Sequence, residues 1–357
     1  YNLSDNERST ALENAVNWLI TAQKANNDGG MGSFHLHNKW SSTYPETTGY
    51  IIPTLLKYGN SHKQAEAVDS ALRAANFLVK IQKPSGGWQG GRIHENKPEI
   101  VFNTGQVIRG MIAAYEQSDN KIYLESAVRA GDWLAEILHP EGYWKTHALM
   151  NQPRVYDAFV DTPLLDLFRI TGNIKYQQVA VKNLEWVINE KMLGNGWFED
   201  CDNTVKRNDR PILHTIAYTL DGLIDCGLKL NDEKYIKAAM KGAVVLRDAF
   251  LSRGFLNGRY NRDWIGSEYM ICTGCAQMSI IWLKLYNISG ENAFIEAAHK
   301  MINLLIFIQS RAFKETGDTK GAISGSFPLW GRYEPFAFPN WATKFFCDAL
   351  LLEEELK

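Results

Sequence analysis

Residues 66–82, EAVDSALRAANFLVKIQ, are followed by the loop SGGWQGGR at 85–92 and then by NTGQVIRGMIAAYEQ at 103–117. The first segment places apolar residues at helical spacing with charged residues such as Asp69 and Arg73 between them, which is typical of a helix with one solvated face. The last segment is small or apolar nearly all round, so it predicts a buried helix. Together they indicate a hairpin of an outer and an inner helix joined by a glycine-aromatic loop.

The same order of segments occurs six times along the 357 residues. Subtracting the numbers of successive loop glycines gives 57, 55, 54, 58 and 71 residues, and a polar insert at 314–320 lengthens the last interval. A period in this range marks a repeat architecture. The glycines that anchor the six loops are Gly30, Gly87, Gly142, Gly196, Gly254 and Gly325.

The repeat predicts an all-α fold of six outer-inner helical hairpins. Glycine follows several inner segments, as in YGN, TGN and SGE, where it serves as a C-terminal cap. No linker-like stretch divides the chain, so we expect a single domain over 1–357. The expected pairs are 8–24 with 46–58, 63–83 with 103–117, 121–138 with 156–171, 174–191 with 212–228, 232–251 with 268–288, and 291–311 with 341–355.

The composition indicates which binding partners and which cellular compartment to expect. A net charge of -2 gives no electrostatic reason to expect nucleic acid, and no apolar stretch approaches the roughly 18–20 residues of a membrane span. The five cysteines are odd in number and four fall in helical segments, which favours a reducing, cytoplasmic compartment over a disulfide scaffold. Nothing in the sequence identifies a protein partner.

One cysteine pattern and one histidine pattern are candidate metal ligands. Cys272 and Cys275 lie in an apolar inner segment without a second pair, so we interpret them as small core residues. His35 and His37 share the first loop with Glu46 downstream, but a lone His-x-His in a polar loop is common. We therefore expect neither a metal nor a cofactor.

Six such hairpins resemble the α/α-toroid superfamily of six-hairpin glycosidases, polysaccharide lyases, sugar epimerases and squalene-cyclase-like enzymes. The stretches YPETTGYIIPTLL at 44–56, VFNTGQV at 101–107 and GSFPLWGRYEPFAFPNW at 325–341 also look like toroid proteins associated with bacterial surface-polysaccharide biosynthesis. This resemblance covers the whole chain and implies an (α/α)6 toroid that acts on a carbohydrate. It does not choose a reaction.

In a toroid the N-termini of the inner helices and the six loops gather at one end. Helix dipoles and aromatic, amide and charged side chains there suit a sugar, and the loop arginines favour an acidic one unless the neighbouring carboxylates pair with them. Trp88, Trp144 and Trp197 follow the loop glycines and are expected to plug the space between hairpins. The predicted substrate-binding residues are Trp40, Tyr44, Arg92, His94, Gln106, Asp200, Arg259, Trp264, Trp330, Arg332, Tyr333 and Trp341.

Several chemistries fit this end of the toroid. Lyase or uronyl C5-epimerase chemistry, which we place first, needs a cation or amide at the uronate and a His or Tyr that moves a proton. Glycoside hydrolysis needs two carboxylates. A terpenoid cyclase needs an acidic cluster in an apolar cavity. A glycan-binding module needs no pair of catalytic residues. Capping at helix N-termini is the simpler explanation for His214, Glu46 and Asn103. The predicted catalytic residues are His214, His147, Tyr260, Tyr156, Asn103, Glu46, Asp157 and Asp161.

Overall fold

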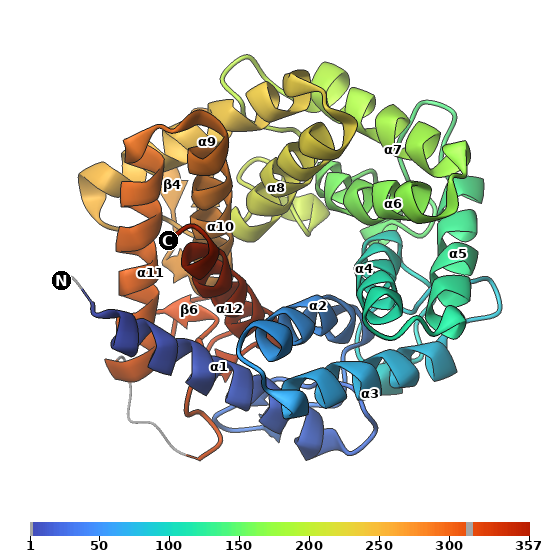
Figure 1. Cartoon of the computed structure of the whole chain (residues 1–357). Helices are drawn as coiled ribbons and strands as arrows, with labels where there is room; N and C mark the ends of the chain where they lie inside the picture. The colour runs from blue at the N-terminus through green and yellow to red at the C-terminus, as the bar shows by residue number, and fades with distance from the viewer. Residues whose placement is uncertain (1–2, 312–316) are drawn as a thin grey trace.

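The computed structural model describes residues 3–311 and 317–357, so residues 314–316 of the predicted insert lie outside it. Within the described ranges, twelve α-helices form two concentric rings (Figure 1), which confirms the predicted toroid. The outer ring consists of α1 (Asp5–Asn26), α3 (Ala65–Ile81), α5 (Lys121–Glu136), α7 (Ile174–Trp186), α9 (Glu233–Arg253) and α11 (Asn292–Arg311). The inner ring consists of α2 (Pro45–Ser61), α4 (Val101–Ser118), α6 (Ala158–Thr171), α8 (Leu213–Leu230), α10 (Cys272–Ser289) and α12 (Asn340–Glu355).

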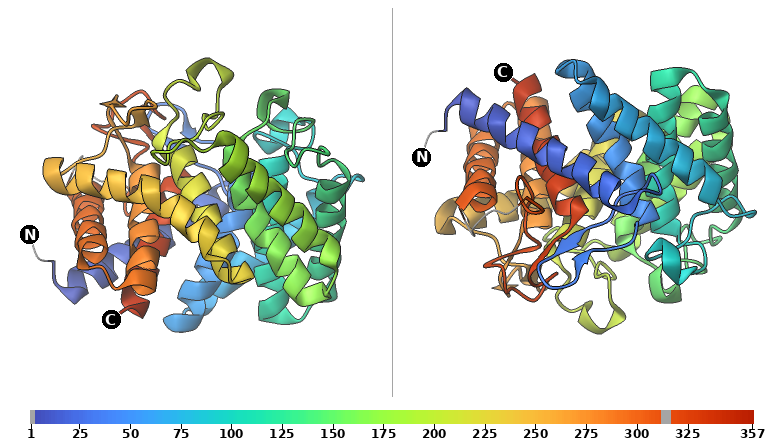
Figure 2. Two further views of the ribbon diagram at one scale, coloured as in Figure 1. Left: turned by 90° about the horizontal axis from the view of Figure 1, so that it is seen from above. Right: turned by 90° about the horizontal axis from the view of Figure 1, so that it is seen from below.

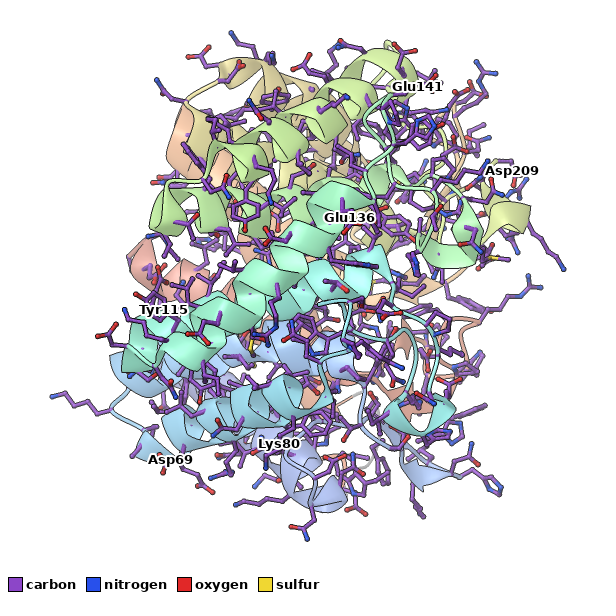
Figure 3. All side chains as sticks on the ribbon, turned by 90° about the vertical axis from the view of Figure 1, so that its right-hand side faces the viewer. Asp69, Lys80, Tyr115, Glu136, Glu141 and Asp209 are labelled. Carbon is purple, nitrogen blue, oxygen red and sulfur yellow. The ribbon has the colours of Figure 1, made fainter. Side chains whose placement is uncertain are left out.

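The inner helices surround the central axis and are buried on nearly every side. Each packs against its two neighbours, and α12 contacts α2 to close the ring. Tight packing of α2 on α4 requires glycine, because a Cβ at Gly49 would lie 2.7 Å from the Cα atom of Val107. The outer helices bury only one face, and Asp69, Lys80 and Glu136 lie on the outer surface (Figure 3).

The loop glycines join each hairpin to the next outer helix. Gly86 has a φ of +102°, which favours glycine, and a Cβ there would collide with the carbonyl of Arg129 in α5. A glutamine side chain secures the same junction, since Gln82 Nε2 donates to the carbonyls of Gly86 at 2.7 Å and Ser126 at 2.9 Å. Gln309 does the same at the seam of the ring, where it donates to Gly321 and to Ala11 of α1.

The loop tryptophans pack as plugs. The indole Nε1 atoms of Trp88 and Trp144 donate to the carbonyls of Leu78 and Leu134 at 2.9 Å, and both rings are buried. Trp197 is also buried and donates to the carbonyl of Tyr260 at 3.1 Å. These three residues therefore fill the space between hairpins, as the packing interpretation predicts.

Short antiparallel strands tie the loops together at the end where the inner helices begin. The β2-β1-β7 sheet joins the α1–α2 loop to the α11–α12 loop, and two smaller pairs are β3-β4 and β5-β6. The repeat pattern did not predict these strands because each has two residues. They are β1 (Phe34–His35), β2 (Lys39–Trp40), β3 (Arg259–Tyr260), β4 (Gly266–Ser267), β5 (Met270–Ile271), β6 (Ser326–Phe327) and β7 (Ala337–Phe338).

Two predicted inner helices begin later than expected. Tyr156 and Asp157 lie in a 3-10 turn, Val155–Asp157, that precedes α6, and residues 270–271 form β5 before α10. Both corrections have one cause, because the chain must turn from the loop into the ring before the helix can start. No helix in the described part of the chain has the length and apolar character required to cross a bilayer.

The middle of the ring carries an aromatic layer. Rings from four inner helices contact one another, with centroid distances of 4.8 Å for Phe102–Tyr218, 4.9 Å for Phe159–Tyr218 and 5.8 Å for Tyr218–Phe345. Tyr50 joins the layer at 5.5 Å from Phe345. This layer separates the N-terminal ends of the inner helices from a charged layer beyond it.

The charged layer is built from opposite charges in contact. Lys284 Nζ lies 2.6 Å from both Asp221 and Asp225, and Lys344 pairs with Asp348. Although burial favours the neutral amine, the two aspartates raise the pKa of Lys284. Paired charges thus fill the lumen toward the C-terminal ends of the inner helices.

Candidate active site

A cavity of about 240 Å³ opens at the end of the toroid where the inner helices begin. The long loops collect at this end (Figure 2), as the parallel arrangement of the inner helices requires. The inner helices that line the cavity do so through residues of their first two turns, and residues from the loops before them complete the wall. The lining residues are Tyr44, Glu46, Thr47, Tyr50, Ile100, Phe102, Asn103, Leu149, Tyr156, Asn203, His214, Thr215, Tyr218, Tyr333, Glu334 and Trp341.

Glu46 is the buried carboxyl group of the cavity. It follows Pro45, the first residue of α2, and its side chain is 8% exposed. Burial raises the pKa of Glu46 to about 7, and a hydrogen bond from the Tyr44 hydroxyl only partly opposes this effect. Asn103 in turn donates to Tyr44, so α4 fixes the donor that faces the carboxyl group. Glu46 therefore exchanges its proton near neutral pH.

Glu334 brings a second carboxyl group to the cavity from the α11–α12 loop. Its φ of +46° is a left-handed conformation that few non-glycine residues adopt. Burial raises the pKa of Glu334, whereas the positive charge of Arg92 and, more weakly, that of His35 lower it. Glu334 is thus a carboxylate with cationic neighbours, unlike Glu46.

His214 lies in the first turn of α8 and is neutral. Burial lowers the pKa of His214 to about 3, despite the nearby charge of Asp202. Its Nδ1 atom has no hydrogen-bond partner within the described residues, and its ring lies 5.0 Å from that of Tyr333. An imidazole in this state can exchange hydrogen bonds with a ligand, but it is a weak base.

Aromatic rings form most of the remaining wall. Trp341 lies edge-on to Tyr44 at 6.1 Å and donates from Nε1 to the Tyr333 hydroxyl at 2.7 Å. Phe102 stands edge-on to Tyr156 at 5.3 Å. Apolar ring faces beside a few hydrogen-bonding groups match the two kinds of surface that a sugar presents.

The floor contains two tyrosines that the sequence reasoning missed. Tyr50 follows Glu46 by four residues in α2, and Tyr218 follows His214 by four residues in α8. One helical turn separates the members of each pair, so spacing from the predicted residues could have found both. The Tyr50 hydroxyl donates to that of Tyr218, and burial raises the pKa of each well above 10.

Seven of the predicted site residues line the cavity. Asn103, Glu46, Tyr156 and His214 come from the predicted catalytic set, and Tyr44, Tyr333 and Trp341 come from the predicted binding set. They lie in the first turns of α2, α4, α8 and α12 or in the segments just before α2, α6 and α12. Glu334 is not among the predicted site residues, because no sequence pattern marked it.

The predicted cations lie outside the cavity and have other partners. Arg259 is buried in an ion pair with Asp202 at 2.8 Å and lies 3.5 Å from Glu268. Arg92 donates to the hydroxyl group of Ser41 and to the carbonyl of Ser42. Arg332 is exposed and lies 3.7 Å from Glu268. Internal pairing therefore accounts for much of the loop charge that had favoured an acidic ligand.

The predicted carboxylates Asp157 and Asp161 are buried outside the cavity lining. Burial raises the pKa of Asp157 to about 8, and it raises that of Asp161 as well. Arg154 supplies a nearby positive charge to Asp157. Asp200 is also absent from the lining and pairs with Lys191 at 2.9 Å, and Gln106 is buried within α4.

The other predicted residues lie outside the cavity lining, and most of them contact the loops. Tyr260 is buried and accepts from the backbone of Asn257 at 2.9 Å, and His147 bonds to the carbonyl of Glu99 at 2.9 Å. His94 bonds to Ser42. The three remaining tryptophans also lie off the lining: Trp40 packs on Trp18, Trp264 donates to the carbonyl of Asn195, and Trp330 is 63% exposed.

Metal-ligating side chains do not converge in the described residues, where no group of three or more His, Cys, Asp and Glu forms a candidate site. His35 Nδ1 accepts the backbone N–H groups of His37 and Asn38 at 3.0 Å. Cys272 and Cys275 are buried with free thiols, like the other three cysteines. Their surroundings are those of core residues.

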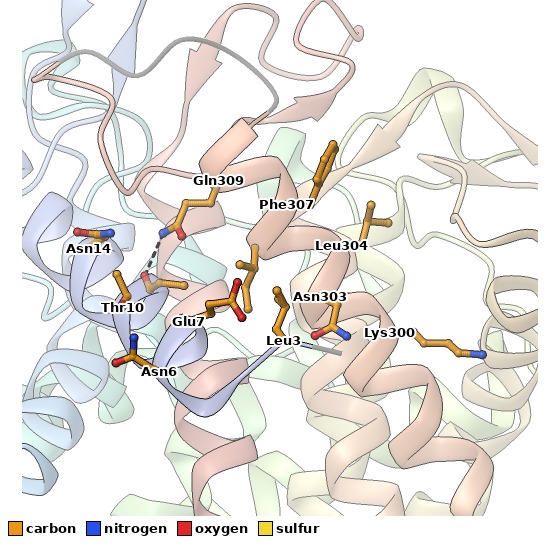
Figure 4. Close-up of a pocket in the computed structure, with 12 residues that line it drawn as sticks. Leu3, Asn6, Glu7, Thr10, Asn14, Lys300, Asn303, Leu304, Phe307 and Gln309 are labelled. Carbon is orange, nitrogen blue, oxygen red and sulfur yellow. Dashed lines mark hydrogen bonds between the residues drawn. The ribbon is translucent and has the colours of Figure 1, made fainter. Parts of the chain in front are cut away.

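A larger groove of about 620 Å³ lies on the outside of the ring, between α1 and α11. Figure 4 shows Leu3, Leu304 and Phe307 along it, with Gln309 bonded across the seam. The groove is lined by residues of α1, α11 and Leu3 just before α1, and it lacks the convergent titratable groups of the smaller cavity. We therefore place the site in the smaller cavity.

A closed (α/α)6 ring with an aromatic, carboxyl-bearing cavity at the start of its inner helices defines a carbohydrate-active toroid. Residues 1–243 match the family model of the beta-L-arabinofuranosidase GH127 catalytic domain. This match covers more than half of the 357 residues, and the chain belongs to that family. Glu46, Asn103 and His214 fall within the matched segment, and Glu334 and Trp341 follow it.

Solved structures share the whole fold at low sequence identity. Unsaturated glucuronyl hydrolase from Bacillus sp. GL1 matches with a TM-score of 0.74 and 15% identity over 97% of each chain. A sugar epimerase from a ruminal bacterium matches with a TM-score of 0.75 and 15% identity over 98% of each chain. Cellobiose 2-epimerase from Bacillus thermoamylovorans matches with a TM-score of 0.75 and 12% identity, also over 98% of each chain.

Proposed function

We propose that this protein is a glycoside hydrolase that releases a single neutral sugar from the end of a glycan or glycoside. Glu46 is the general acid and Glu334 is the second carboxylate. The observation that carries the proposal is Glu46 itself, a buried carboxyl group with a pKa of about 7 that faces an aromatic cavity. Hydrolysis was the alternative to lyase or epimerase chemistry in the sequence reasoning, and membership of a glycosidase family supports it.

Burial raises the pKa of both carboxyl groups, but only Glu334 has cations that oppose this shift. Glu46 has no cationic partner among the causes of its pKa shift, so its protonated form persists up to neutral pH. Arg92 and His35 favour the ionised form of Glu334. A carboxyl group that keeps its proton up to neutral pH and a second one with cationic neighbours fit the roles of a general acid and its catalytic partner.

In the proposed reaction, Glu46 donates its proton to the glycosidic oxygen while the bond between that oxygen and the anomeric carbon breaks. Glu334 then either bonds to the anomeric carbon or removes a proton from the attacking water. The first route retains and the second inverts the anomeric configuration, which NMR of the fresh product distinguishes. Tyr44 and Asn103 orient Glu46, and Trp341 and Tyr333 provide faces for the sugar ring.

The lining favours a neutral sugar over a uronate. None of the described residues that line the cavity is Arg or Lys, whereas two are glutamates. A uronate would therefore face carboxyl groups without a cation on the lining to neutralise it. The volume, about 240 Å³, is below the roughly 300–1,000 Å³ typical of drug-sized ligand sites, which suits one sugar ring rather than a terpenoid chain.

Lyase and epimerase chemistry needs a base strong enough to remove a proton from carbon. The low pKa of His214 makes it a weak base, and burial raises the pKa values of Tyr44, Tyr156 and Tyr218, which disfavours a tyrosinate. A carboxyl acid is better suited to this cavity than either group. We therefore place hydrolysis ahead of proton abstraction.

The test is a panel of nitrophenyl glycosides, including arabinofuranosides, glucosides and galactosides, together with an unsaturated glucuronyl disaccharide. We expect release of one neutral sugar by the wild type and its loss in Glu46→Gln and Glu334→Gln. Glu136→Gln, a matched change on the outer surface, should retain full activity. Release of the unsaturated uronate alone would contradict the neutral-sugar assignment.

Two further results would contradict hydrolysis altogether. New ultraviolet absorbance from an unsaturated uronate made out of an intact polysaccharide would establish a lyase. Binding of glycosides measured by calorimetry, without turnover of any of them or of free disaccharides, would establish a glycan-binding module.

A further inference from the structure

The rim of the cavity carries an exposed aliphatic pair, Leu149 and Met150, in the loop between α5 and α6. Leu149 lines the cavity and is 37% exposed, and Met150 is 55% exposed. Neither side chain can form the hydrogen bonds that a sugar hydroxyl needs. The rim therefore differs in chemistry from the aromatic and polar wall below it.

The backbone of this rim is held in an unfavourable conformation. His147, Met150 and Asn151 have φ angles of +63°, +60° and +50°, and left-handed backbone is uncommon for a residue with a Cβ atom. Because this backbone conformation is unfavourable, the surrounding structure must impose the turn. Strain of this kind next to a cavity points to a role for the side chains that it presents.

Hydrogen bonds fix the turn to the start of α4. The backbone N–H of Val101 donates to the carbonyl of His147 at 2.9 Å, and the His147 ring bonds to the carbonyl of Glu99 at 2.9 Å. Within the turn, the N–H of Asn151 donates to the carbonyl of Ala148 at 2.8 Å. The aliphatic pair is thus anchored to the same helix that brings Asn103 to the cavity.

We infer that Leu149 and Met150 bind an apolar aglycone, an aryl or alkyl group attached to the sugar ring that occupies the cavity. This inference rests on the proposed function for its placement of the sugar. A group that leaves the cavity at the rim passes Leu149, which lines the cavity, and reaches Met150 next. Contact with such a group removes apolar surface from water, which a second sugar would do less well.

The experiment compares methyl, phenyl and octyl glycosides of one sugar by calorimetry, with octyl glycoside below its micelle concentration. Glu46→Gln protein is used so that turnover does not interfere. We expect octyl glycoside to bind at least about tenfold more tightly than methyl glycoside, since burial of about two methylene groups is sufficient for that ratio. The phenyl compound distinguishes an aryl preference from an alkyl one.

The rim variant combines Leu149→Ser with Met150→Asn, because asparagine tolerates the left-handed backbone at 150. We expect it to reduce the octyl-to-methyl affinity ratio to within about threefold. Leu228→Ser is the matched control, a similarly exposed leucine in the last turn of α8 at the opposite end, and should keep the full ratio. Circular dichroism confirms that each variant is folded.

Equal affinity for methyl and octyl glycosides, or a ratio that survives in the rim variant, would overturn the inference. Hydrolysis without chain-length selectivity would remove the rim assignment and leave the hydrolase. If chain-length selectivity depends on the rim but the protein hydrolyses no glycoside, the rim assignment stands and the hydrolase proposal is refuted. Failure of every glycoside to bind would remove both.

Discussion

The cavity and the charged layer lie on opposite sides of the aromatic layer and both use residues of the inner helices. The buried charged groups in these two regions have different surroundings. In the cavity, Glu46 is buried without a cation among the groups that set its pKa. In the charged layer, Lys284 lies 2.6 Å from both Asp221 and Asp225. Burial alone does not indicate function, because a buried charge with a partner can be structural, whereas a buried carboxyl group without one has a pKa suited to acid catalysis.

The largest change is expected in kcat/KM, which should depend on the cavity and not on the charged layer. Glu46→Gln should lower kcat/KM for a glycoside by about 10²–10⁴-fold, because general acid catalysis is worth that much. Asp221→Asn in the charged layer should change kcat/KM less than threefold in folded protein. Rates measured side by side at pH 6 check this, and an equal loss in both variants would refute the distinction.

The ionisation of Glu46 should also make the stability of the folded protein depend on pH. The folded-state pKa of Glu46 is raised, so the folded protein binds more protons than the unfolded chain between about pH 4.5 and 7, and wild-type stability from this group falls as the pH rises through that window. Glu46→Gln removes this loss. Its melting temperature at pH 8 should therefore equal or exceed that of the wild type.

The second effect removes a partner from the charged layer. Lys284→Met leaves Asp221 and Asp225 without their cation and should lower the free energy of unfolding by about 2–3 kcal/mol, less than for a fully buried pair because Lys284 is partly exposed. Urea denaturation measures the loss. The Lys284→Met, Asp221→Asn double variant should recover part of it, and simple additivity of the two losses would argue against pairing.

The third effect concerns His214, a buried base of the cavity. Its folded-state pKa, about 3, is below the unfolded value of about 6.5, so the stability that the neutral ring supports is present above pH 6.5 and decreases as the pH falls toward 3. Between pH 7 and pH 5 the wild type should lose about 1–2 kcal/mol more than His214→Gln. Urea denaturation at the two pH values tests this, and equal losses would contradict it.

The smallest effect is a shift of the pH profile. Activity should fall as Glu46 loses its proton near pH 7, and the hydrogen bond from Tyr44 lowers the pKa of Glu46. Tyr44→Phe removes that bond, so the basic limb of kcat/KM should move to higher pH. Tyr143→Phe, a change in the α5–α6 loop outside the lining, should leave the profile in place.

The helix pattern could be predicted because it is a local property. The outer segment 63–83 and the inner segment 103–117 match α3 and α4 within a few residues, since amphipathic spacing and glycine caps lie within the segments themselves. Glu46 and His214 were found for a related reason. Each is a polar residue in the first turn of a helix whose direction the hairpin repeat already sets.

The pairing of side chains could not be predicted in the same way. Arg259 was expected at a ligand, yet Asp202, 57 residues earlier, holds it in a buried ion pair. Glu334 reaches the cavity through a left-handed turn in a loop that carries no periodic signal.

The six hairpins, and the end of the ring at which the inner helices begin, could be predicted from the sequence alone, because periodicity, glycine turns and helix direction depend on neighbouring residues. Which polar groups share the cavity, and which are paired with opposite charges elsewhere, depends on the folded arrangement of the chain. Asp157 and Glu46 are both acidic residues near the start of inner helices, but only Glu46 lines the cavity. The physical reason is that burial and Coulomb interactions depend on distance in space between segments far apart in the chain.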